Sequence, residues 1–127
     1  MRSPEYAADR TALLILDPYN DFMSEGRKLY EATWDTAEAV RFYDNMRKLI
    51  AAIRATRIQV IIVAAPLLAR NGYKGWKHMN PTQFRGNEIQ GLAAVTWSGE
   101  FLPNSAPRDG DVVSEHWGQS GFANYRS

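Results

Sequence analysis

The 127-residue sequence contains no cysteine. Without a thiol, the chain has no disulfide framework, no thiolate metal ligand and no sulfur nucleophile. It also lacks an apolar run long enough to span a bilayer, since the longest, Val60 to Leu68, includes Pro66. The N-terminal MRSPEYAADR has no apolar segment of the kind found in a secretory signal. These absences favour a cytoplasmic protein with no membrane partner.

The composition is typical of a soluble globular protein, with 45% hydrophobic and 23% charged residues. The length predicts a single domain, residues 1–127. The net charge is only +1, but residues 41–85 carry nine basic side chains and one acidic one. That segment could attract an anion, although a solvated helix face and an exposed loop would give the same pattern. No nucleic-acid-binding motif accompanies the basic residues, so we expect no nucleic-acid partner.

Three apolar segments predict β-strands. Thr11–Asp17 is apolar without alternation, which is typical of a parallel strand buried on both faces. Ile58–Ala65 is rich in β-branched residues and ends before Pro66, and Asp111–Glu115 predicts a short third strand. Strand, helix and strand in succession imply a right-handed crossover and a parallel sheet. The fold class is therefore α/β, with about half of a doubly wound, Rossmann-like sheet.

One helix is expected between the first two strands. Asp35 and Glu38 resemble a capping box at its start. Its apolar positions at helical spacing are Phe42, Met46, Leu49, Ile50 and Ile53. The connection from Pro66 to Gly110 predicts only a short helix near Pro81–Gln90, and a connection of this length is usually functional or mobile.

Ligands of open parallel sheets bind at the carboxyl ends of the strands. Asp17, the loop after Ala65 and the Glu115-His116 pair belong at that end. Because Asp17 closes an apolar strand, its carboxylate is expected to be partly desolvated and suited to acid/base chemistry. The alternative is a carboxylate that only caps the following turn.

Four segments, in order, resemble the isochorismatase-like (cysteine hydrolase) family, over about Thr11 to Asn124. Leu14–Phe22, LILDPYNDF, resembles the family's hydrophobic strand followed by D-x-x-x-D-F. Gly75–His78 and Thr96–Glu100 resemble later family segments, and Val112–Phe122 resembles its V-V-x-K-x-x-x-S-A-F stretch. The resemblance implies the family's α/β fold and a small-molecule substrate.

The resemblance also implies roles for individual residues. Asp17 matches the family's catalytic acid/base, and Asp21 matches an Asp that is mainly structural. The family's catalytic Lys falls on His116 or, in members with an E-H-W sequence, on Ser114, so an imidazole could replace the cation. Asp17 and His116 are thus the expected catalytic residues. The expected substrate-binding residues are Tyr19, Phe22, Trp76, Lys77, His78, Trp117, Ser120 and Phe122.

The family's nucleophilic Cys lies on a strand–helix turn beyond the last matched segment, so we expect a truncated version of the fold. Ser120 is a conceivable substitute, but it matches a packing and turn Ser of the family. His78, His116 and Asp17 could form a two-His-one-carboxylate metal set. The D-x-H pattern of the metal-binding nicotinamidases is absent after Ala65, so neither a metal nor another cofactor is expected.

Two functions follow as hypotheses. The first is a hydrolase-like enzyme that acts on a small, anionic carbonyl, amide or enol-ether substrate with Asp17 and His116 as acid/base residues. The alternative is a catalytically inactive, truncated homologue that binds a ligand or a partner subunit through its exposed half-sheet; an incomplete gene product is a third reading. An open apolar strand edge at TALLILD would template pairing with another chain. We therefore expect a homo-oligomer or a complementing subunit.

Overall fold

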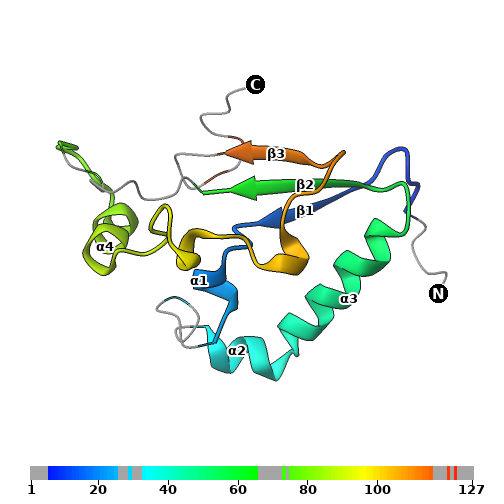
Figure 1. Ribbon diagram of the computed structural model, residues 1–127, viewed down its shortest axis with the longest axis horizontal. Helices are drawn as coiled ribbons and strands as arrows, with labels where there is room; N and C mark the ends of the chain where they lie inside the picture. The colour runs from blue at the N-terminus through cyan, green and yellow to red at the C-terminus, as the bar shows by residue number, and fades with distance from the viewer. Residues whose placement is uncertain are drawn as a thin grey trace.

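The computed structural model describes residues 6–25, 29, 33–65, 73, 75–115, 120 and 122. Its elements in chain order are β1 (Ala12–Leu16), α1 (Asn20–Met23), α2 (Trp34–Ala39), α3 (Phe42–Arg54), β2 (Gln59–Ala64), α4 (Pro81–Ile89), the 3-10 helices η1 (Trp97–Gly99) and η2 (Pro103–Ser105), and β3 (Val112–Glu115). The strands form one parallel sheet in the order β1-β2-β3, with all three arrows pointing the same way in Figure 1. The predicted α/β class is confirmed.

One face of the sheet packs against α3. In the parallel register Ile15 of β1 lies opposite Ile62 of β2. Side chains alternate between the two faces of a strand, so the odd-numbered positions of β1 and the even-numbered ones of β2 share this face. The buried cluster is Ile15, Ile50, Val60 and Ile62, joined by Leu13, Met46, Ile53 and Phe101. This cluster forms the core that holds α3 on the sheet.

The opposite face of the sheet is only partly covered, with Val63 and Ser114 buried but the side chains of β1 exposed, which corrects the expectation that β1 is buried on both faces. Leu14 is 44% exposed and Leu16 is 60% exposed. Val112, which shares this face through the register of Leu14 with Ile61 and of Ile61 with Val112, is 45% exposed. Within the described residues, β1 pairs only with β2.

The single helix expected from Asp35 is in fact two helices. Arg41 adopts a left-handed backbone conformation (φ 52°) between α2 and α3, which ends the first helix and redirects the chain. The Asn45 side chain supports this break by donating to the carbonyl of Val40 at 3.0 Å. The capping-box prediction is wrong, because α2 starts at Thr33 without a side-chain cap bond. A capping box is present instead at α4, between Asn80 and Gln83.

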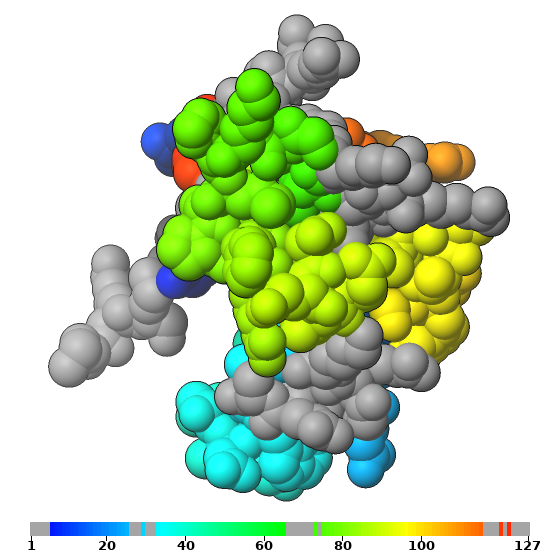
Figure 2. All heavy atoms as spheres, turned by 90° about the vertical axis from the view of Figure 1, so that its left-hand side faces the viewer, coloured from blue at the N-terminus to red at the C-terminus, as the bar shows by residue number. Residues whose placement is uncertain are grey.

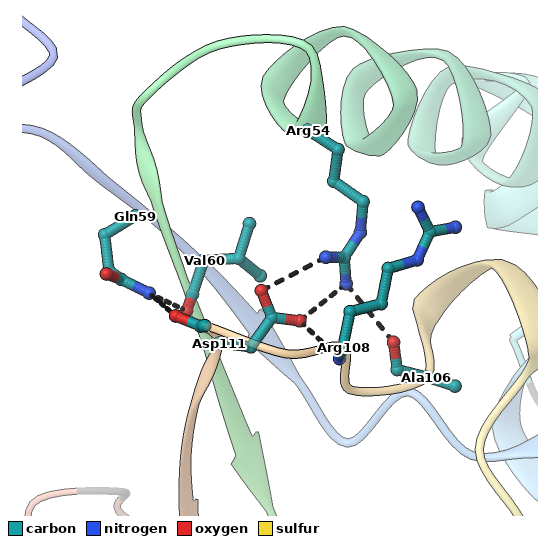
Figure 3. Close-up of polar contacts among 7 residues, drawn as sticks. Arg54, Gln59, Val60, Ala106, Arg108 and Asp111 are labelled. Atoms are coloured by element: carbon teal, nitrogen blue, oxygen red, sulfur yellow. Dashed lines mark hydrogen bonds and ion pairs between the residues drawn. The ribbon is translucent and has the colours of Figure 1, made fainter.

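A buried ion pair ties the end of α3 to the residue before β3 (Figure 3). Arg54 donates through its two terminal nitrogens to the Asp111 carboxylate at 3.1 and 2.8 Å, and the side chains are only 10% and 7% exposed. Burial alone would raise the pKa of Asp111. The hydrogen bond from Arg54, the backbone N–H of Arg108 and the two positive charges outweigh it, so the pKa lies below its usual value. This pair fixes the amino end of β3, opposite to the end where Asp17 lies.

Candidate active site at the carboxyl end of the sheet

Asp17 follows β1 at the carboxyl end of the sheet. Its backbone N–H donates to Val63 at 2.9 Å, which extends the parallel ladder, and its Oδ1 accepts from the N–H of Ala65 at 2.7 Å. Its φ of 48° is in the left-handed region, which costs a non-glycine residue about 1–2 kcal/mol. Asp tolerates this conformation better than most residues. The carboxylate is thus held in one orientation by the residue that follows the neighbouring strand.

Tyr19 also bonds to Ala65, the residue whose N–H donates to Asp17. Its hydroxyl donates to the carbonyl of Ala65 at 2.7 Å, its ring stacks on Phe101 with centroids 4.8 Å apart, and the side chain is almost fully buried. Burial raises the pKa of Tyr19 to about 12, and the negative charges of Asp17 and Glu115 add to the rise. Tyr19 therefore stays a neutral hydrogen-bond donor at physiological pH.

A groove of about 530 Å³ opens beside Asp17, between the end of β1 and the helices α1, α2 and α3. We call it the Asp17 groove. Its lining residues are Leu16, Asp17, Phe22, Met23, Thr33, Thr36, Ala37, Val40, Phe42 and Tyr43. A mostly apolar cavity with one carboxylate is the usual form of a small-molecule site. Phe22 and Asp17, both expected at the site from the sequence, lie on the same groove.

The short helix α1 anchors the long connection that precedes β3. Buried Asp21 accepts from the backbone N–H of Leu92 at 2.9 Å through Oδ2. Asn20 donates through its side chain to the carbonyl of Trp97 at 2.9 Å, and its backbone N–H donates to Glu100. Figure 2 looks at the molecule from the left-hand side of Figure 1, toward which the strands point, and residues 75–100, green to yellow, cover much of that end. Asp21 thus makes the structural contacts that the resemblance implies.

Trp76, Lys77 and His78 are exposed and do not line the Asp17 groove. They lie just before α4, where Trp76 contacts the ring of Tyr73 with centroids 5.1 Å apart. A contact between these three residues and a ligand at Asp17 stays a prediction.

The residues after β3 are described only in part. His116 and Trp117 lie outside the described residues, so the expected pairing of Asp17 with His116 stays a prediction. Ser120 and Phe122 are exposed, and the Ser120 hydroxyl accepts from the backbone N–H of Phe122 at 3.2 Å. Ser114, the other position that matches the family's Lys, is buried and pairs with Val63.

Two further searches cover only the part of the chain that the structure describes. There, no three His, Asp or Glu side chains converge as a metal site would require. Over the same residues, no helix combines the length and the apolar character needed to cross a bilayer.

The structure is thus an α/β fold with a parallel sheet, a carboxylate at the end of its first strand and a groove beside that carboxylate. The family model described as the isochorismatase domain matches residues 11–126. The chain therefore belongs to the isochorismatase domain family.

Curated relatives support this assignment at low identity. Ureidoacrylate amidohydrolase RutB from Acinetobacter baylyi is 29% identical over 132 residues, covering 94% of this chain and 53% of the relative. RutB from Yersinia enterocolitica is 30% identical over 129 residues, covering 94% and 56%. The chain thus spans about half the length of the curated relatives it matches.

Solved structures show the same relation. A cysteine hydrolase from Pseudomonas syringae pv. phaseolicola matches with a TM-score of 0.64 and 26% identity, over 98% of this chain and 54% of that one. N-carbamoylsarcosine amidase from Thermoplasma acidophilum matches with a TM-score of 0.57 and 22% identity, over 91% and 56%, which supports the fold alone.

Proposed function

We propose that this chain carries the acid/base half of a hydrolase active site, with Asp17 as the principal proton-transfer group. The single observation that carries the proposal is the fixed Asp17 carboxylate, which lies at the carboxyl end of the sheet and borders the Asp17 groove.

The reaction that suits this site is hydrolysis of a small amide or ureido compound. Asp17 would accept a proton from the attacking group as that group adds to the substrate carbonyl. The same proton would then pass to the leaving nitrogen as the C–N bond breaks. The relatives named for ureidoacrylate hydrolysis favour this substrate class. An anionic substrate would be drawn by an exposed cation such as Lys77, which precedes α4 at the same end of the sheet.

The 127 residues contain no thiol, so this chain supplies no sulfur nucleophile. Acting by itself, the chain would use water, activated by Asp17 and, in our proposal, by His116. General acid/base catalysis of this kind contributes on the order of 10²–10⁴-fold to a rate. A chain without a covalent nucleophile is therefore expected to be a slow hydrolase.

The second candidate function is binding without catalysis, through the uncovered part of the sheet. Its support is the exposed apolar side chains of Leu14 and Val112 together with the edge of β1, which pairs with no second strand among the described residues. Such an edge readily pairs with another chain. We propose that a second copy or a complementing subunit covers it.

An activity assay separates these two functions. The whole chain is incubated with small ureido and amide substrates, and ammonia or amine release is followed for wild type and Asp17→Asn. Asp9→Asn is the matched control, since Asp9 is exposed and pairs only with the adjacent Arg10. Turnover that Asp17→Asn abolishes and Asp9→Asn preserves supports the hydrolase. No turnover in any of the three proteins, together with a native mass above that of a monomer, favours the binding role.

A further inference from the structure

A second groove, of about 610 Å³, lies between α3 and η2. We call it the basic groove, because Arg47, Lys48, Arg54 and Arg108 line it together with the amide of Asn104. Arg54 ends the helix that leads into β2, and Arg108 stands just before β3, so this groove lies at the amino end of these strands. Asp17 lies at the other end. The lining that the structure describes includes no acidic residue.

The charges in the basic groove are only partly neutralised. Arg54 is paired with Asp111, and Arg47 with Asp44 on the preceding turn of α3. Neither Lys48 nor Arg108 has an ion-pair partner among the described residues. Two full positive charges therefore remain in one groove, where each adds to the attraction for an anion.

Arg54 and Arg108, which both line the basic groove, lie near each other. Figure 3 shows the guanidinium of Arg108, from the loop before β3, beside that of Arg54, from α3. The backbone N–H of Arg108 donates to the Asp111 carboxylate at 2.9 Å, which places Arg108 next to the Arg54–Asp111 ion pair. The Arg54 Nε is buried and has no hydrogen-bond partner among the described residues. Asp111 thus accepts from the two terminal nitrogens of Arg54, and the Nε–H of Arg54 stays without an acceptor among the described residues.

We propose that the basic groove binds a small organic polyanion that carries phosphate or carboxylate groups. Lys48 and Arg108 supply the uncompensated charges, and Asn104 and the Arg54 Nε supply neutral and charge-assisted donors. The volume exceeds what a single phosphate ion needs and lies within the range of small-molecule sites. The proposal does not depend on the function of Asp17.

Titration calorimetry with the full-length chain tests the proposal, with tripolyphosphate and citrate as probes at constant ionic strength. The test variants are Lys48→Gln and Arg108→Gln. The second keeps the backbone N–H that bonds Asp111 at 2.9 Å, so the buried ion pair is undisturbed. Arg85→Gln is the control, because Arg85 is an exposed cation on α4 that pairs with Glu88, away from the groove.

We expect wild type and Arg85→Gln to bind at least one probe with equal affinity. Each groove variant should bind it at least tenfold more weakly, which is about 1.4 kcal/mol, with an unchanged melting temperature in the absence of anion. A response to tripolyphosphate alone identifies a phosphate ligand, and a response to citrate alone identifies a carboxylate ligand. No binding of either probe at millimolar concentration, or equal losses in Arg85→Gln and Arg108→Gln, would overturn the proposal.

Discussion

The backbone N–H of Ala65 donates to the carboxylate of Asp17 at 2.7 Å, so the residue after the first strand is fixed by the residue after the second. Tyr19 binds the carbonyl of the same Ala65, and both polar groups of that residue are therefore satisfied from the β1 side. A carboxylate oriented by a backbone group keeps its position when neighbouring side chains change.

Tyr19→Phe should lower the free energy of unfolding by about 1 kcal/mol, the usual net value of one hydrogen bond. The same substitution should also change how the free energy of unfolding depends on pH above pH 10. The pKa of Tyr19 is about 12 in the folded chain, above the usual 10, so the unfolded chain ionises first. The stabilisation is fully present below pH 10 and is lost as the pH rises from 10 to about 12.

Urea denaturation between pH 8 and pH 11 measures this effect, at pH values set on either side of the usual tyrosine pKa. Tyr6→Phe is the control, because Tyr6 is 70% exposed. Wild type and Tyr6→Phe should lose stability together above pH 10, with a smaller loss in Tyr19→Phe. An identical pH dependence of the free energy of unfolding in all three proteins would contradict a buried Tyr19 hydroxyl bonded to Ala65.

Asp21→Ala should destabilise the chain by about 1–3 kcal/mol, because it leaves the N–H of Leu92 without its acceptor. The long connection would then loosen where α1 holds it. Urea denaturation followed by circular dichroism checks this, with Asp9→Ala as the exposed control. A loss in Asp21→Ala no larger than in Asp9→Ala would argue against α1 as the anchor.

The hydrophobic pattern and the turn residues correctly predicted the three strands, their parallel arrangement and the short helix that begins at Pro81. These patterns failed where a backbone conformation or the packing of other elements decides the structure. The break at Arg41 has no glycine or proline to signal it, because a basic residue supplies the left-handed conformation. The apolar pattern of β1 correctly indicates a strand with two apolar faces, but a pattern does not say whether both faces are covered within the chain.

At the site, the sequence located Asp17 and Phe22 on what proves to be one groove. It missed the shared contact of Asp17 and Tyr19 with Ala65, because no local pattern links residues almost fifty positions apart. Pro18 favours an extended backbone at the residue before it, so the local pattern does not signal the positive φ of Asp17. The basic segment of residues 41–85 indicated an anion-attracting surface, but only the fold brings Arg108 beside Arg54.

The uncovered face of β1 predicts self-association or assembly with another chain. Leu14→Lys places a charge on the exposed face, outside the Asp17 groove, and should shift the chain from oligomer to monomer, because a charge buried at such a contact is costly. Multi-angle light scattering measures the native mass. Val95→Lys, at a residue 89% exposed elsewhere on the surface, should leave the oligomer intact. A monomeric wild type at working concentration would contradict this prediction.

The most direct test of the role of Asp17 compares kcat in Asp17→Asn and Asp17→Ala. Asn keeps an oxygen that can accept from Ala65 N–H but cannot take up a proton, whereas Ala loses both properties. We predict that Asn restores the melting temperature of wild type while kcat falls about 10²-fold or more in both variants. If Asp17→Asn retains the wild-type kcat, the carboxylate only holds the turn and the account of this site is wrong.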